Sequence, residues 1–293
     1  MQDSSSTTWK FEGNIATCGG PNLFWSTDVQ HPDGGVSLRA SGGSPLPTDS
    51  EAMARVFALS LEGQPASSLR LCDAFAKANH LYSRYEDWSD GDPRNGWEIH
   101  LALTARRLAA ETIWQDAHAE RHRGAEEYDL EAVISARTEN PGLERDVRIG
   151  FHGPAEEISW QGIALDDAER RTATVPIHIA KNEKDVGAER TADLGGFSFP
   201  LIGLPGSSSV LGLLVHPAGI RPLQLEESAV PVFFDFRDGR FSLEYRVFPL
   251  CLEKGVVVRS AFQLLLLDRA KAEERFHEAA RRFLSSPPPL TEE

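Results

Sequence analysis

Aromatic, acidic and amide side chains gather between residues 85 and 100, in the segment YEDWSDGDPRNGWEIH. A tryptophan ring can stack on a sugar ring while neighbouring polar groups hydrogen-bond the sugar hydroxyls. The residues that we expect to contact such a ligand are Trp88, Asp90, Arg94 and Trp97. Glycine and proline interrupt any regular backbone here. We therefore predict a surface loop over 87–96, followed by a strand that begins at Trp97.

The acids of this segment lack the spacing of a calcium loop. An EF-hand loop alternates oxygen ligands before its glycine, whereas Gly91 here falls between Asp90 and Asp92. His118 and His122 could share one face of a helix, but the glutamate between them is misplaced for a zinc-protease motif. The chain also contains no phosphate-binding glycine loop and no dinucleotide fingerprint. We predict no metal site and no cofactor.

Histidines and carboxylates near strand ends are the candidates for acid–base chemistry, because imidazole changes charge near neutral pH. The catalytic candidates that the sequence offers are His152, His216, Glu226 and Asp235, with His100 and His178 in the same wider group. A lone histidine is more often a structural residue, so proximity in space has to decide. A histidine and a carboxylate at a shared pocket would favour an enzyme. A cleft lined by tryptophan and tyrosine without such a pair would favour a binding protein.

The elements that must position these residues are strands, since most of the chain alternates apolar and polar residues. The clearest case is VFFDFRDGRFSLEYRVF at 232–248, where Asp238-Gly239 suits a two-residue type I′ turn. Such a turn would place Phe236 opposite Phe241, and Phe234 opposite Leu243. The apolar faces of both strands then coincide, so we predict a hairpin with one buried side.

The same alternation recurs in other segments, including 97–104, 128–134 and 175–179. The stretch 256–267 is almost continuously apolar, which is typical of a strand covered on both faces. The stretches 69–86 and 106–120 fit either strands or helices. Both lie between clearer strands, and we therefore favour strands.

The C-terminal region has a helical pattern instead. Asp268 can cap a helix, and apolar residues then follow at helical spacing: Phe276, Ala279, Ala280, Phe283 and Leu284. Three prolines from 287 end the pattern. We predict a helix over 268–285 that packs outside a sheet. The whole chain, 1–293, is predicted to form one large antiparallel β-sandwich domain, with a disordered tail over 1–8.

The composition excludes several classes of protein. The chain of 293 residues has 30 Lys and Arg against 44 Asp and Glu, a formal charge of −14, so we expect no nucleic-acid partner. Three distant cysteines form no disulfide framework, and we expect Cys72 and Cys251 to be buried. The polar N-terminus resembles no signal peptide, and no apolar run could span a bilayer. We expect a cytoplasmic protein without a membrane partner.

Four segments carry a family resemblance: DAFAKANHLYSRYED at 73–87, HPAGIRPLQL at 216–225, PLCLEKGVVVRSAF at 249–262 and FLSSPPPLT at 283–291. They resemble uncharacterised bacterial proteins, chiefly of planctomycete type. The resemblance implies a two-sheet β structure similar to the supersandwich of galactose mutarotases. It implies no activity, cofactor or catalytic residue, because a fold does not determine a function.

The leading functional hypothesis from the sequence is a non-catalytic binding or accessory protein with a carbohydrate-like ligand. The alternative is a sugar-active enzyme of epimerase or mutarotase type that uses a histidine and a carboxylate. The sequence leaves open whether the protein is an enzyme, which ligand it takes and what oligomer it forms.

Overall fold

The computed structural model describes residues 7–19, 23–40, 53–61, 68–89, 91–92, 96–108, 127–140, 147–163, 197–216, 232–247 and 254–286. Within these ranges the chain forms two eight-stranded sheets in which every neighbouring pair is antiparallel. The first sheet has the order β1 (Lys10–Glu12), β2 (Ile15–Gly19), β3 (Leu23–Asp28), β4 (Val36–Ala40), β5 (Ala54–Leu61), β10 (Val147–Pro154), β15 (Arg240–Arg246) and β14 (Val232–Arg237). The second has the order β11 (Glu157–Ile163), β12 (Phe197–Gly203), β13 (Ser209–Val215), β16 (Val258–Asp268), β9 (Tyr128–Thr138), β8 (Trp97–Arg107), β7 (His80–Asp87) and β6 (Leu69–Lys77).

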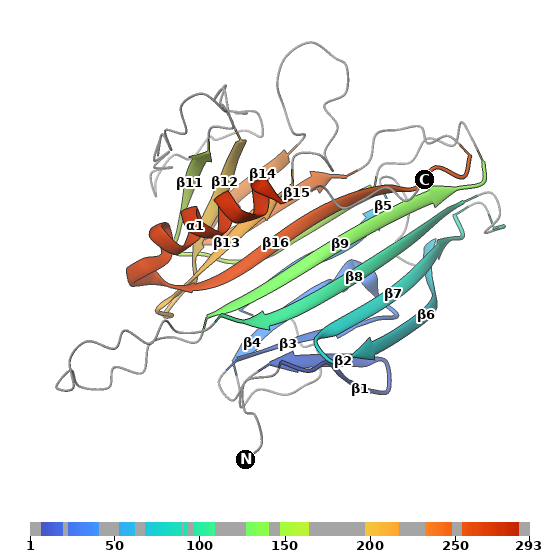
Figure 1. The fold of residues 1–293 in the computed structure, drawn as a ribbon, viewed down its shortest axis with the longest axis horizontal. Helices are drawn as coiled ribbons and strands as arrows, with labels where there is room; N and C mark the ends of the chain where they lie inside the picture. The colour runs from blue at the N-terminus through green and yellow to red at the C-terminus, as the bar shows by residue number, and fades with distance from the viewer. Residues whose placement is uncertain are drawn as a thin grey trace, which may run out of the picture.

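The two sheets pack face to face as a large sandwich, and their inner faces supply the core (Figure 1). An aromatic cluster joins them: the rings of Phe57 of β5 and Phe151 of β10 lie 5.3 Å apart, and their centroids are 6.2 and 6.1 Å from that of Phe262 of β16. Strands β7 and β8 bury alternate residues, because successive side chains point to opposite faces, whereas β13 is buried along its whole length. The predicted all-β antiparallel sandwich is confirmed.

The predicted hairpin has the expected register. Phe236 pairs with Phe241 and Phe234 pairs with Leu243. Asp238 and Gly239 form the turn with φ values of 51° and 70°, the left-handed conformations that a type I′ turn requires. Phe241 and Leu243 are fully buried, while the two phenylalanines of β14 are half-buried at the edge of the sheet.

The predicted C-terminal helix is also present. The Asp268 side chain accepts a hydrogen bond from the backbone N–H of Ala270 and begins a 3-10 turn, η5 (Arg269–Lys271), that leads into α1 (Ala272–Ser285). The Phe276 ring lies directly over Gly212 of β13 and is fully buried. The helix lies on the outer face of the second sheet, across β13 and β16 (Figure 1). The β9 to β6 half of that face carries no helix in the described part of the chain.

Several further predictions can be compared with the structure. The stretch 69–86 forms the hairpin β6–β7, as predicted, whereas 109–120 and 175–179 lie outside the described residues. The predicted disordered tail is wrong for residues 7 and 8, because Thr7 is buried and donates a hydrogen bond to the Ala105 carbonyl; residues 1–6 lie outside the described ranges. The prediction that Cys72 is buried is wrong as well. The β6–β7 register shifts between Leu71 and Asp73, and Cys72 is exposed at this irregularity. Cys251 lies outside the described residues.

Candidate functional site

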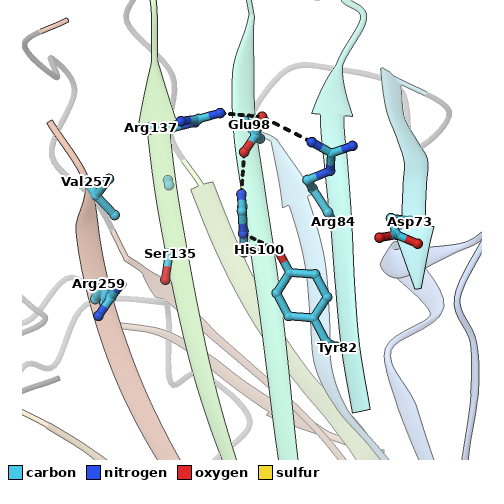
Figure 2. Close-up of a pocket in the computed structure, with 10 residues that line it drawn as sticks. Asp73, Tyr82, Arg84, Glu98, His100, Ser135, Arg137, Val257 and Arg259 are labelled. Carbon is cyan, nitrogen blue, oxygen red and sulfur yellow. Dashed lines mark hydrogen bonds and ion pairs between the residues drawn. The ribbon is translucent and has the colours of Figure 1, made fainter. Parts of the chain in front are cut away.

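A groove of about 500 Å³ lies on the outer face of the second sheet, across the β6, β7, β8, β9 and β16 side. Its lining residues come from five neighbouring strands and the segment before β16: Asp73, Tyr82, Arg84, Glu98, His100, Ser135, Ala136, Arg137, Val257 and Arg259. Figure 2 shows these side chains on the β16, β9, β8, β7 and β6 side of the sheet. The lining is mostly polar or charged, so the groove suits a ligand that is bound through hydrogen bonds and ion pairs.

Strand alternation accounts for the outward position of the functional groups. In β8, Trp97, Ile99 and Leu101 are buried in the core, and the intervening Glu98 and His100 face the groove. The same two-residue period operates in β7, where Leu81, Ser83 and Tyr85 are buried between outward-facing Tyr82 and Arg84.

Cross-strand register then arranges the outward residues in rows. Arg259 pairs with Ser135, Ser135 pairs with His100, and His100 pairs with Arg84. Arg84 pairs in turn with Asp73 of the edge strand. One row across five strands therefore joins residues that are far apart in the sequence. In a neighbouring row Arg137 stands opposite Glu98, so an arginine faces a carboxylate there.

A carboxylate, an imidazole and a phenol form a continuous hydrogen-bonded chain in this groove (Figure 2). His100 donates from Nε2 to Glu98 Oε1, and Tyr82 donates its hydroxyl to His100 Nδ1 over 2.5 Å. The bond to Glu98 assigns the proton of the neutral imidazole to Nε2, because an ionised carboxylate only accepts. Nδ1 is then left as the acceptor for the Tyr82 hydroxyl.

Arg137 and His100 keep Glu98 ionised. Arg137 donates to Glu98 Oε2 over 3.0 Å, and Arg84 lies 3.8 Å from the same oxygen. Burial by itself would raise the pKa of Glu98, but the hydrogen bonds from Arg137 and His100 outweigh it, so this pKa lies below its ordinary value. The carboxylate is therefore an anchor for the imidazole rather than a proton donor at neutral pH.

Tyr82 ends the chain at the groove. Its ring stands edge-on to the His100 ring, with centroids 5.6 Å apart, and contacts the exposed Phe75 at 5.0 Å. Burial raises the pKa of Tyr82, so the phenol stays protonated and holds a hydrogen to donate at neutral pH. The arrangement resembles a carboxylate–histidine–hydroxyl triad in its order of groups, with a tyrosine in the hydroxyl position.

The structure places the catalytic candidates from the sequence elsewhere. His216 lies beneath the end of α1, where its Nε2 is 3.2 Å from the Ser286 carbonyl and its ring contacts Phe283. His152 lies on the outer face of the first sheet, and its Nδ1 is 3.0 Å from Ser242 Oγ. Desolvation lowers the pKa of His152. Asp235 pairs with Arg237 at 2.9 Å in the edge strand β14. None of these three lines the groove, while Glu226 and His178 lie outside the described residues.

The ligand contacts expected from the opening segment need a correction at Trp97. Trp97 begins β8 as predicted, but its side chain is fully buried and packs in the core, so it faces no ligand. Trp88 is half-buried, and the Arg70 guanidinium lies over its ring at 4.4 Å. Asp90 and Arg94 lie outside the described residues.

The described residues contain no group of three or more His, Cys, Asp or Glu side chains arranged to hold a metal ion. His118 and His122 lie outside them. No helix in the same ranges is long and apolar enough to cross a membrane.

Comparison with known proteins assigns neither a family nor an activity. No protein-family model matches the chain, and no curated protein matches it in sequence. A crystal structure of a protein assigned as an aldose 1-epimerase from Klebsiella pneumoniae subsp. pneumoniae is similar, with 12% sequence identity and a TM-score of 0.36. The match covers 97% of this chain and 90% of that one. A likeness of this degree assigns no activity.

The central residues of the groove were largely missed by the sequence analysis, which named His100 only within the wider group of histidines. Tyr82, Glu98 and Arg137 come from three strands, and only the register brings them together. One local signal did exist. Glu98 and His100 are two residues apart in a predicted strand, which places a carboxylate and an imidazole on the same face.

Proposed function

We propose that the groove is an acid–base site that acts on a carbohydrate-like substrate. The observation that carries this proposal is the chain Glu98–His100–Tyr82, a carboxylate, an imidazole and a phenol that end at a polar groove. This is a histidine and a carboxylate at a shared pocket, the arrangement that favours an enzyme over a binding protein. Its polar lining supports a hydroxylated substrate, because hydroxyl groups are recognised by precisely placed donors and acceptors.

The chain can move a proton in either direction. A substrate hydroxyl gives its proton to Tyr82 Oη, while the phenol proton passes to His100 Nδ1. The imidazolium that results is stabilised by the ionised Glu98, which accepts from Nε2 throughout. The reverse transfer returns the proton to the substrate and restores the neutral imidazole. This relay suits a reaction that begins with loss of a proton from a sugar hydroxyl, as the interconversion of sugar anomers does.

Direct measurement of anomer interconversion by NMR exchange spectroscopy tests the proposal. The protein is expected to accelerate interconversion in at least one member of a panel that contains glucose, galactose and their uronic acids. Tyr82→Phe and His100→Asn should lower the accelerated rate by about a hundredfold, the usual contribution of a positioned acid or base. His152→Asn is the matched control, because this histidine also bonds a hydroxyl across strands but lies on the other sheet.

Binding titrations on the same variants separate catalysis from binding. If sugars bind and no anomer exchange occurs, the groove is a binding site and the accessory-protein hypothesis replaces the enzyme. If Tyr82→Phe and His100→Asn keep the full rate while folded, as judged by circular dichroism, the proton relay is wrong.

A cytoplasmic location and membership of the planctomycete-type family are also our proposals, and both rest on sequence patterns alone.

A further inference from the structure

The charge of the groove differs in sign from that of the chain. The protein has a formal charge of −14, yet the groove lining contains three arginines and two carboxylates. With His100 neutral, the lining carries a net charge of +1. A concave site with a positive lining attracts anions, whereas the rest of an acidic protein surface repels them.

The charges are also unevenly distributed along the groove. Glu98 is already neutralised by Arg137 at 3.0 Å, with Arg84 at 3.8 Å. Asp73 pairs with Arg84 in the register of β6 and β7, at one end of the row. Arg259 occupies the opposite end of the same row, on β16. The carboxylates therefore lie toward the β6–β8 side, and the β16 side presents a cation to the groove (Figure 2).

The separation of the strands that carry Arg259 and His100 suits a sugar. Arg259 and His100 are separated in the row by Ser135, and neighbouring strands are about 4.8 Å apart, so the two backbones are about 10 Å apart. A pyranose ring with one exocyclic group can bridge this span. Ser135 forms the floor between them, because its small side chain leaves room above the sheet (Figure 2).

We propose that the substrate is an acidic sugar whose anionic group, a carboxylate or a phosphate ester, is bound by Arg259 while a ring hydroxyl meets Tyr82. This proposal rests on the proposed function of the groove and adds the class of substrate. A guanidinium binds either anion through two parallel hydrogen bonds, so it fixes the orientation of the ring as well as its charge. Arg259 is thereby a specificity-determining residue.

Calorimetric titration with glucose, glucuronate and glucose 6-phosphate tests the proposal. One of the two acidic sugars is expected to bind at least about tenfold more tightly than glucose, the effect of one charge-assisted hydrogen bond. The comparison of glucuronate with glucose 6-phosphate identifies the anion. Arg259→Gln should abolish the preference, with the acidic sugar binding no more tightly than glucose does to the same variant, whereas Arg259→Lys should retain part of the preference. Arg148→Gln is the matched control, because Arg148 pairs with Glu244 on the other sheet.

Each outcome bears on one proposal or on both. Equal affinity for glucose and the acidic sugars, or an unchanged preference in Arg259→Gln, overturns the acidic-sugar proposal. Anomer exchange without the acidic preference overturns it too, and leaves the acid–base function standing. Preference for an acidic sugar without any anomer exchange overturns the acid–base function instead. If none of the three sugars binds and no member of the anomer-exchange panel reacts, both proposals are wrong.

Discussion

The contact between Phe276 and Gly212 predicts that the effect of Gly212→Ala on stability depends on whether the Phe276 ring is present. A Cβ atom added at Gly212 would lie 2.5 Å from Cδ2 and 2.8 Å from Cε2 of the Phe276 ring. Real Cβ atoms essentially never come this close to another heavy atom, and the ring is fully buried, so it has little space to move into. Gly212→Ala should therefore destabilise the protein by about 1–3 kcal/mol through overpacking.

Removal of the ring reverses this expectation. Phe276→Ala alone should cost about 3–5 kcal/mol, as for other buried phenylalanines. With the ring absent, the closest remaining neighbour of the methyl group that Gly212→Ala adds is Leu201 Cδ2 at 3.1 Å, the end of a flexible side chain that can shift by a few tenths of an ångström into the vacated space. Alanine also has fewer unfolded conformations than glycine, which stabilises a compatible site by about 0.4–1 kcal/mol. Gly212→Ala should then be neutral or stabilising in the Phe276→Ala background.

A double-mutant cycle measured by urea denaturation gives the coupling between the two positions. The expected coupling energy is about 1–3 kcal/mol, with the double variant more stable than additivity predicts. Phe283→Ala in place of Phe276→Ala is the control, since Phe283 is half-buried further along the same helix. If Gly212→Ala destabilises equally with and without the Phe276 ring, the packing of α1 on β13 described here is wrong.

Three further predictions concern the turn, the helix and the groove. Gly239→Val should destabilise by about 1–3 kcal/mol in urea denaturation, because a β-branched residue resists the φ of 70° at this turn; a loss equal to that of Gly34→Ala would contradict it. Truncation after Asp268 removes α1 and exposes the sheet face beneath it, so the melting temperature should fall and aggregation increase; unchanged melting and solubility would show that the helix adds no stability. Because the pKa of Glu98 is lowered in the folded state, its stabilisation is present above the ordinary value of 4.5 and is lost as the pH falls through the lower folded value. Glu98→Gln should remove this contribution from the acid unfolding curve, and identical acid slopes for both proteins would refute it.

Local patterns in the sequence determine the parts of the fold that were predicted correctly. The hairpin around Asp238-Gly239 is specified by its turn residues and by two alternating strands, so the register follows without knowledge of the rest of the chain. The C-terminal helix follows in the same way from the cap at Asp268 and an apolar stripe. Both features depend on residues that are close together in the sequence.

The site depends on contacts that no local pattern encodes. Tyr82, His100 and Ser135 become neighbours only when β7, β8 and β9 pair in one particular register. A shift by one residue would turn every one of these side chains into the core. Trp97 was wrongly predicted to contact a ligand, because it lies beside polar residues in the sequence. The alternation of side chains along β8 instead points its ring into the core. Cys72 was misplaced for a related reason, since the irregularity of β6 interrupts the alternation that its neighbours follow.

The alternation of β7, β8 and β9 has a consequence for how this protein can be redesigned or diversified. Outward residues such as Arg84 and Arg137 contact the groove, and the positions between them supply the core. Replacing the outward residues leaves the inward residues of the core unchanged, so such substitutions should reduce folding stability only slightly. A library randomised at the groove positions 82, 84, 100, 135, 137 and 259 should therefore yield mostly folded variants, and a screen of that library would test whether the groove sets ligand preference.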